Sequence, residues 1–278
     1  MKTSIKLIGI VALLLGVSGS ALAQDFTAAD MVQAIRTATP QDLYATMERG
    51  EMVECFECIP MLERMLLESD VATNREIAAW WLRKRLFGFG PVYVRTRDAL
   101  TSDPDPVRRA RAAEALGEFL DHHALVPLAD AVRNDASDVV RTAAVSALGR
   151  LNHPGGNVTI AAAMTDPSVD VRRAAMTAVR TVNFFREYDA LLSGLADDDT
   201  AVRRRAVLLV GQHRVEAAAP ALAGLLRGDA DPDVRQSSAW ALGRLATAEA
   251  RAALNETLGT ETVSLVRDAI EVALRMRR

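Results

Sequence analysis

The sequence predicts an all-α protein built as a solenoid of stacked helical hairpins. Half of its 278 residues are hydrophobic but only 5% are aromatic, and alanine, leucine, valine and arginine dominate, which is typical of helices packed on helices. Similar segments recur along the chain, such as RTAAVSALGRL from residue 141 and RQSSAWALGRL from residue 235. Repeats of about 30 residues are the signature of a solenoid, in which each unit packs only on its neighbours.

Residues 1–23 read as a secretory signal peptide. Two lysines precede an uncharged apolar run over residues 7–17, and small residues ending in ALA at 21–23 follow. The run is shorter than the roughly 20 residues that a membrane-spanning helix needs. We therefore expect cleavage before Gln24, export to the periplasm or the extracellular space, and no membrane span.

The charge balance excludes one class of partner. The formal net charge is −3, and removal of the two lysines in the signal peptide makes the mature chain more acidic. Proteins that bind nucleic acid depend on basic faces that neutralise phosphates. We therefore expect no nucleic-acid partner.

Residues 24–98 form an atypical N-terminal part. The segment from residue 69, SDVATNREIAAWWLRKRLFGFG, keeps an arginine at 75 and reads as a degenerate repeat. Upstream we expect a short helix, a turn near Gly50, the cysteine segment, and a helix from about Pro60 to Glu68. The end layer of a solenoid must close the core against water, so these helices are predicted to form a cap.

The chain has two cysteines, Cys55 and Cys58. An oxidising compartment and an even count favour a disulfide, and residues three apart can reach the Cα separation of about 4.4–6.8 Å that a disulfide needs. Pro60 would interrupt the helix of a thioredoxin-like site, the two nearby glutamates oppose a reactive thiolate, and zinc would need two more ligands. We predict a structural disulfide, with a redox-active pair and a metal or interchain bond as alternatives.

Aromatic residues concentrate before the repeats, and two interpretations are open. They could seal the first layers as a cap, with the adjacent tryptophans facing different directions about 100° apart on a helix. They could also form a partner-binding patch, because exposed rings are enriched at interfaces. The residues of this candidate patch are Trp80, Trp81, Phe87, Phe89 and Tyr93.

Residues 99–278 form the regular array. In each unit a first helix runs to a glycine that fits a helix stop, and a second apolar stretch follows. The third unit ends AVRTVNFFREY without the glycine, so a longer turn carrying Phe184 and Phe185 is expected. The glycines are Gly117, Gly149, Gly211 and Gly243.

An acid–arginine pair recurs in each of these units. The arginines stand 31 or 32 residues apart, and an acid precedes each by six. The pairs could form an electrostatic binding ladder. Alternatively, each acid caps a helix while the arginine of the adjoining unit reaches it, which ties the layers together; we favour this structural ladder. Its members are Asp103, Arg109, Asp135, Arg141, Asp166, Arg172, Asp197, Arg203, Asp229, Arg235, Glu261 and Arg267.

Three segments, DPSVDVRRAAMTAV, DADPDVRQSSAWALGRL and DPDPVRRARAAEALGEF, resemble HEAT repeats of the short bacterial, phycobilisome-lyase-like kind. The resemblance covers about residues 100 to 278. It implies a right-handed superhelix of helix pairs, with the second helix of each pair on the concave side, often used to bind another protein. Some members with similar repeats are subunits of bilin lyases or isomerases.

No catalytic or phosphate-binding motif is visible in the sequence, and we expect neither an enzyme nor a cofactor. The four histidines, His122, His123, His153 and His213, fall in turns at one edge of the solenoid, which is a weak metal signal. The sequence therefore predicts an exported scaffold that binds a protein partner through its concave face and its aromatic end. The alternatives are a cofactor-handling accessory resembling bilin lyase subunits, and a thiol-redox or metal protein using the cysteine pair.

Overall fold

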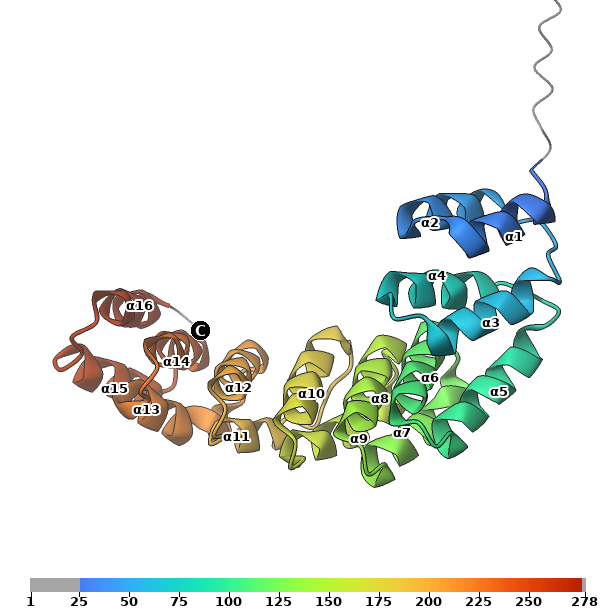
Figure 1. The fold of residues 1–278 in the computed structure, drawn as a ribbon. Helices are drawn as coiled ribbons and strands as arrows, with labels where there is room; N and C mark the ends of the chain where they lie inside the picture. The colour runs from blue at the N-terminus through green and yellow to red at the C-terminus, as the bar shows by residue number, and fades with distance from the viewer. Residues whose placement is uncertain (1–25, 277–278) are drawn as a thin grey trace, which may run out of the picture.

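A computed structural model describes residues 26–276, which form an arc of paired helices (Figure 1). The predicted all-α solenoid is confirmed: the described residues contain sixteen α-helices, four short 3-10 helices and no strand. The signal peptide predicted over residues 1–23 lies outside the described residues. Within residues 26–276, no helix is long and apolar enough to cross a membrane.

Five helices make up the N-terminal part of the arc. Thr39 caps α2 by accepting a hydrogen bond from the Asp42 N–H, and Pro40 occupies the first turn, where a missing N–H costs nothing. Gly50 ends this helix, and the cysteine segment leads into α3, as the sequence predicts. The five are α1 (Ala28–Thr37), α2 (Pro40–Arg49), α3 (Cys58–Glu68), α4 (Ala72–Leu82) and α5 (Phe89–Ser102).

The repeat array places two rows of helices along the arc (Figure 1). The inner row is α6 (Pro106–Glu118), α8 (Asp138–Leu151), α10 (Val169–Thr181), α12 (Thr200–His213), α14 (Pro232–Leu245) and α16 (Ser264–Arg275). The outer row is α7 (Leu125–Asn134), α9 (Asn157–Ala162), α11 (Ala190–Gly194), α13 (Ala219–Gly228) and α15 (Ala248–Leu258). The 3-10 turns η1 (His122–Ala124), η2 (Pro154–Gly156), η3 (Ala163–Thr165) and η4 (Glu216–Ala218) adjoin α7, α9 and α13.

The inner row carries the ladder arginines, which corrects one expectation. The resemblance implied that the second helix of each pair lines the concave side, and the sequence units begin with the arginine helix. In the structure the arginine helices themselves face the concave side (Figure 1). They carry the small residues that allow close approach, so the array is narrower along this row and curves toward it.

The four repeat glycines do not stop their helices, contrary to expectation. Each lies inside the last turn and faces an alanine of the next inner helix; a Cβ built on Gly149 would lie 2.8 Å from the Cβ of Ala178. They are required for helix–helix contact rather than for turn geometry. The left-handed residues that end or directly follow these helices come three positions later, at Leu120, Asn152, Arg214 and Ala246, with φ of 48–55°.

The third unit departs from this pattern, as its sequence indicates. Arg180 replaces the glycine, and the chain runs from the end of α10 to Ala190 before the next helix begins. Within that turn Phe185 is buried, at 2% exposure, whereas Phe184 is 59% exposed. Consequently α12 packs less closely on α10 than the other inner helices pack on their neighbours.

Candidate functional site

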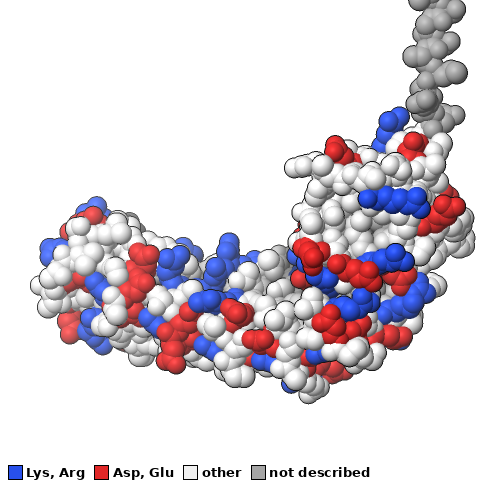
Figure 2. Space-filling model, in the orientation of Figure 1, with Lys and Arg blue, Asp and Glu red and all other residues white. Residues whose placement is uncertain are grey.

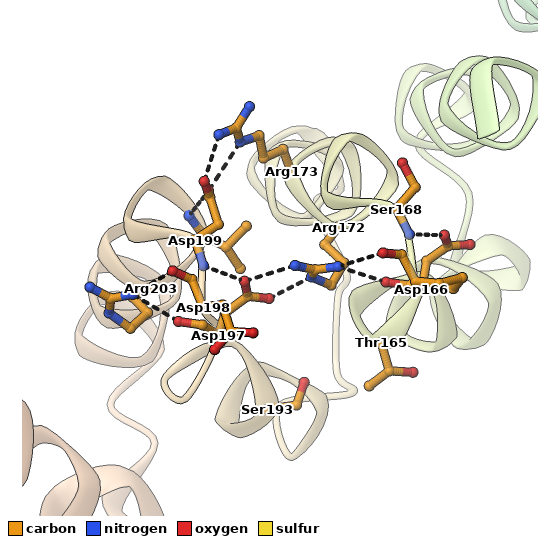
Figure 3. Close-up of polar contacts among 12 residues, drawn as sticks. Thr165, Asp166, Ser168, Arg172, Arg173, Ser193, Asp197, Asp198, Asp199 and Arg203 are labelled. Atoms are coloured by element: carbon orange, nitrogen blue, oxygen red, sulfur yellow. Dashed lines mark hydrogen bonds and ion pairs between the residues drawn. The ribbon is translucent and has the colours of Figure 1, made fainter.

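The acid–arginine ladder connects successive layers, and Arg172 on α10 illustrates it (Figure 3). Its Nε and Nη2 donate to the two carboxylate oxygens of Asp197 at 2.6 and 3.0 Å. Its Nη1 donates to the backbone carbonyls of Asp166 and Pro167 at 2.9 and 3.2 Å. One guanidinium therefore holds the loop before its own helix and the corresponding loop of the next unit.

The same two-pronged contact recurs along the array. Each acid follows an outer helix or 3-10 turn, and its carboxylate also accepts a backbone N–H at the start of the next inner helix, as Asp135 does from Ser137 at 2.9 Å. The carboxylates are only 4–10% exposed, so their lone pairs are used internally. The pairs are Arg109–Asp135, Arg141–Asp166, Arg172–Asp197, Arg203–Asp229 and Arg235–Glu261.

The ladder changes at both ends. Asp103 pairs with Arg108 at 2.9 Å, because the degenerate repeat directs Arg75 to Glu114 instead, at 2.8 Å. At the other end Arg267 donates to the Glu261 carbonyl at 3.2 Å, and no acid pairs with it within residues 26–276. The five complete pairs thus join the layers between α6 and α16.

Contacts with the ladder arginines lower the pKa of Asp166 and of Glu261 despite their burial. Burial alone would raise the pKa of Asp166, but the Arg141 guanidinium and the Ser168 N–H outweigh it and hold the pKa below its usual range. The hydrogen bonds from Arg235 likewise lower the pKa of Glu261. The ladder carboxylates already accept hydrogen bonds from arginines and backbone N–H groups, so they are poorly placed to bind a ligand.

A first hollow of about 610 Å³ opens on the concave side along α4, α6, α8 and α10. Small residues of the inner helices, such as Ala143, Ser146 and Ala174, contribute to its lining. Its charged side chains are largely paired with each other or with flanking residues, as in Arg173–Asp199 at 2.5 Å. It is an open groove whose lining carries five acidic and three basic side chains among small residues.

A second hollow of about 440 Å³ lies on the concave side of α12, α14 and α16. It is more apolar than the first, because Leu208, Trp240, Leu265 and Val272 line it. Leu208 is 40% exposed, and Leu265 and Val272 are 53% and 54% exposed. Such exposed apolar side chains in one concavity are typical of a binding surface.

Sequence reasoning missed these groove residues, although the repeat register contains the signal. Positions one, two and five residues after each ladder arginine face the concave side in unit after unit, as Thr142, Ala143 and Ser146 do after Arg141. Aligned repeats would have identified these positions. Trp240 falls at one of them, outside the predicted aromatic patch.

Cys55 and Cys58 form a disulfide with a Cα separation of 5.3 Å. Both residues are almost fully buried, at 2% and 0% exposure. The bond fixes the loop that starts α3, where the Cys58 N–H also bonds to the Cys55 sulfur at 3.2 Å. A buried sulfur pair has poor access for thiol exchange, so the geometry favours the structural role over the redox alternative.

The aromatic end divides into core and surface, which corrects part of the predicted patch. Trp81 is completely buried, at 0% exposure, with the Arg85 guanidinium 3.7 Å from its ring centroid. Phe89 packs on Phe119 with centroids 5.1 Å apart and on Tyr93 at 6.2 Å. Trp81, Phe89 and Tyr93 therefore belong to the cap, because they pack against the first layers.

Two residues of the predicted patch retain exposed surface. Trp80 is half-buried against Tyr44, with centroids 5.7 Å apart, while Phe87 is 70% exposed. Leu86, which the prediction did not include, is 91% exposed next to Phe87. The surface at this end is an apolar loop tip rather than a stack of rings.

Two of the four histidines lie side by side at the edge of the array. The rings of His122 and His153 approach to 4.5 Å between centroids. No group of three or more histidine, cysteine or acidic residues gathers to hold a metal ion within residues 26–276. His123 instead pairs with Asp121 at 2.7 Å.

Comparison with known proteins identifies the repeat. No curated protein matches the sequence. Among solved structures the chain resembles a chain from the complex in which Kap95p binds RanGDP, with a TM-score of 0.63 at 12% identity, over 90% of this chain and 41% of that one. It also resembles the Escherichia coli protein YibA, with a TM-score of 0.56 at 16% identity, over 90% and 92% of the two chains.

A phycocyanin lyase complex, CpcE and CpcF from a Nostoc species, matches over 96% of this chain and 98% of that chain at 19% identity, with a TM-score of 0.36. At these identities the likenesses with TM-scores of 0.63 and 0.56 show the fold alone. The sequence model of HEAT repeats matches residues 94–180 and 188–275, which is more than half of the chain. Together with the stacked inner and outer helices, this match establishes that the chain belongs to the HEAT-repeat proteins.

Proposed function

We propose that this chain is a protein-binding scaffold that holds its partner on the concave face. The observation that carries the proposal is the extended concave surface, with its open hollow of about 610 Å³ across α4, α6, α8 and α10. Solenoids use such extended concave surfaces for binding. In the similar structure with a TM-score of 0.63, Kap95p binds RanGDP.

The charge pattern of the first hollow suits a protein partner. Arg75 pairs with Glu114 at 2.8 Å, and Arg173 pairs with Asp199 at 2.5 Å. A surface of mixed, mutually paired charges offers no basic stripe to a phosphate backbone. It offers hydrogen-bonding groups and small residues, which allow a partner helix or extended segment to approach closely.

Export to the cell envelope is part of the proposal. It is supported by the signal-peptide pattern of residues 1–23 and by the buried disulfide, which suits an oxidising compartment. Amino-terminal sequencing of the protein recovered from the envelope fraction tests it. We expect the mature chain to begin at Gln24; an uncleaved protein found only in the cytoplasm would contradict export.

Two matched substitutions test the concave face. Val139 is 56% exposed on α8 and lines the first hollow, whereas Val158 is 68% exposed on α9 in the outer row. Val139→Arg places a large charged side chain in the groove, and Val158→Arg makes the same change outside it. We expect Val139→Arg to abolish photo-crosslinking of envelope proteins to the inner helices, while Val158→Arg leaves it unchanged.

Two results would count against the scaffold. If both substitutions reduce crosslinking equally, or if neither reduces it, the concave face is excluded as the binding surface. A chromophore that copurifies with the protein in the absence of any protein partner would favour the cofactor-handling alternative. The absorbance spectrum of the same preparation distinguishes the two functions.

A further inference from the structure

The inner helices differ at one register position of the concave face, the second residue after each ladder arginine. The second residue after each ladder arginine is small where it lines a hollow: Ala143 and Ala174 line the first hollow, and Ser237 and Ala269 line the second. In α12, between the two hollows, the same register position is Arg205. Arg111 stands at this position in the first unit and pairs with Asp70 at 2.5 Å, so Arg205 is the guanidinium at this register position without an acid partner within residues 26–276.

Arg205 carries a charge that the protein does not balance. It is half-buried, and it has no hydrogen bond or ion pair to any acid within residues 26–276. Burial lowers the pKa of Arg205, and the positive charges of Arg180 and Arg204 lower it further. Arg204 has its own acid, Asp233, at 3.0 Å. A half-buried guanidinium without an anion is a site that an incoming carboxylate would stabilise.

The junction between α10 and α12 is packed more loosely than the other junctions of the inner row. Elsewhere a glycine packs on an alanine of the next inner helix, but here Arg180 and Leu209 occupy those two positions. The backbones therefore stay farther apart, and a second guanidinium lies near Arg205. Figure 2 shows basic side chains projecting from the inner side of the arc around α10 and α12.

The apolar hollow begins directly beside Arg205 and Arg180, which together form an arginine cluster. Leu208, one helical turn after Arg205, is its first lining residue, and Trp240 on α14 and Leu265 on α16 follow. Neighbouring helices lie about 8–10 Å apart, and an extended chain advances about 3.3 Å per residue. A segment that crosses these helices would reach the apolar pocket about three to six residues from the arginines.

We infer that the partner carries an acidic–apolar segment, whose carboxylates bind Arg205 and Arg180 and whose apolar side chains fill the hollow of α12, α14 and α16. This inference rests on the proposed scaffold function and names the chemistry of its partner. Arginine binds carboxylates through two parallel hydrogen bonds. The adjoining apolar pocket favours a peptide over a polyphosphate or nucleic acid, which would leave that pocket unfilled.

A peptide array on the purified protein tests this chemistry. The probes are short serine–glycine peptides with two adjacent aspartates and two leucines, separated by about two to seven residues, and matched peptides with asparagine in place of aspartate. Affinity is measured by fluorescence anisotropy. We expect the best binding at separations of about three to six residues, and at least about tenfold weaker binding of the asparagine peptides.

Variants assign the binding to the cluster. Arg205→Ala and Arg180→Ala should each weaken the aspartate peptides by about tenfold, and Leu208→Ala should weaken aspartate and asparagine peptides alike. The control is Arg133→Ala, which makes the same charge change at a 54% exposed arginine on the outer helix α7. It should change the affinity by less than about twofold. Unfolding midpoints of all variants show that they remain folded.

Three outcomes would overturn the inference. Absence of binding by every aspartate peptide, affinity unaffected by both cluster substitutions, or displacement of the peptides by single-stranded oligonucleotide at lower concentration would each contradict it. Failure of the scaffold itself is distinguishable. If Val139→Arg blocks partner crosslinking while Arg205→Ala does not, the concave face still binds protein and only the acidic–apolar chemistry is wrong.

Discussion

Removal of Arg141 tests whether the ladder, rather than the apolar core alone, holds the layers together. Arg141→Ala deletes two hydrogen bonds to the Asp166 carboxylate, at 2.7 and 2.8 Å. It also deletes those to the carbonyls of Asp135 and Ala136, at 3.0 and 3.3 Å. The α8 backbone is untouched, and alanine is the best helix former, so the helix itself should persist.

The expected loss in the free energy of unfolding follows from the Asp166 carboxylate, which the substitution leaves without its arginine. The Arg141 and Asp166 side chains are 13% and 9% exposed, so the substitution leaves a nearly buried carboxylate without its counter-ion. Breaking a buried pair in this way costs about 3–5 kcal/mol. Asp166 retains the Ser168 N–H at 2.8 Å, which places the expected loss near the lower end, about 3 kcal/mol.

The assay must resolve local as well as global stability, because a solenoid unit contacts only its neighbours and unfolding need not be two-state. We would measure urea unfolding by circular dichroism and hydrogen exchange of peptides from α8 and α10. The double variant with Asp166→Ala completes a thermodynamic cycle, with an expected coupling of about 1–3 kcal/mol. Exchange should rise most in the two layers that the pair joins.

The control is the exposed pair Arg133–Asp130 on α7, in which both side chains are 54% exposed. Such surface pairs contribute about 0.2–1 kcal/mol. If Arg141→Ala costs no more than Arg133→Ala, the ladder contributes nothing beyond a surface pair, and the structural interpretation of the repeated acids and arginines is refuted.

Further predictions concern the glycine contact, a helix end, the ladder acids and the disulfide. Gly149→Ala should cost about 1–3 kcal/mol in urea unfolding, because its Cβ meets the next helix at 2.8 Å. Ala246→Gly should raise the thermal unfolding midpoint, gaining up to about 1 kcal/mol, since this residue has φ of 52°. The lowered pKa of Asp166 contributes stability that is present above about pH 4 and lost as pH falls through the folded value; Asp166→Asn should flatten that acid limb. Replacing Cys55 and Cys58 with alanine should cost about 2 kcal/mol and leave partner crosslinking unchanged.

The architecture was predictable because it repeats. A contact between layers must recur with the layers, so the acid before Arg141 and the arginine itself appear in every unit at fixed spacing. Their roles in joining loops follow from charge and hydrogen-bonding capacity. The family resemblance adds the solenoid, which the structure and the family match confirm.

The glycines and the tryptophans could not be placed from local sequence alone. Gly149 near a helix end fits both a left-handed stop and a close contact, and only the position of Ala178 on the next helix decides between them. Trp80 and Trp81 are adjacent, and their exposure depends on which side of α4 meets α6. Burial is a tertiary property, so an aromatic cluster in sequence does not distinguish a cap from a binding surface.

The same glycine–alanine contacts also explain why the concave face has two halves. Where Gly117, Gly149, Gly211 and Gly243 meet alanines, the inner helices pack closely and the floor is continuous. At Arg180 that contact is absent, and the two family matches also break there, between residues 180 and 188. The hollow lined by charged side chains therefore ends at α10 and the more apolar hollow begins at α12, with the unpaired Arg205 between them. A partner that spans the arc would meet the first hollow, then Arg205 and Arg180, then the apolar hollow. Because these three surfaces differ and lie in a fixed order, the concave face favours one orientation of a bound segment.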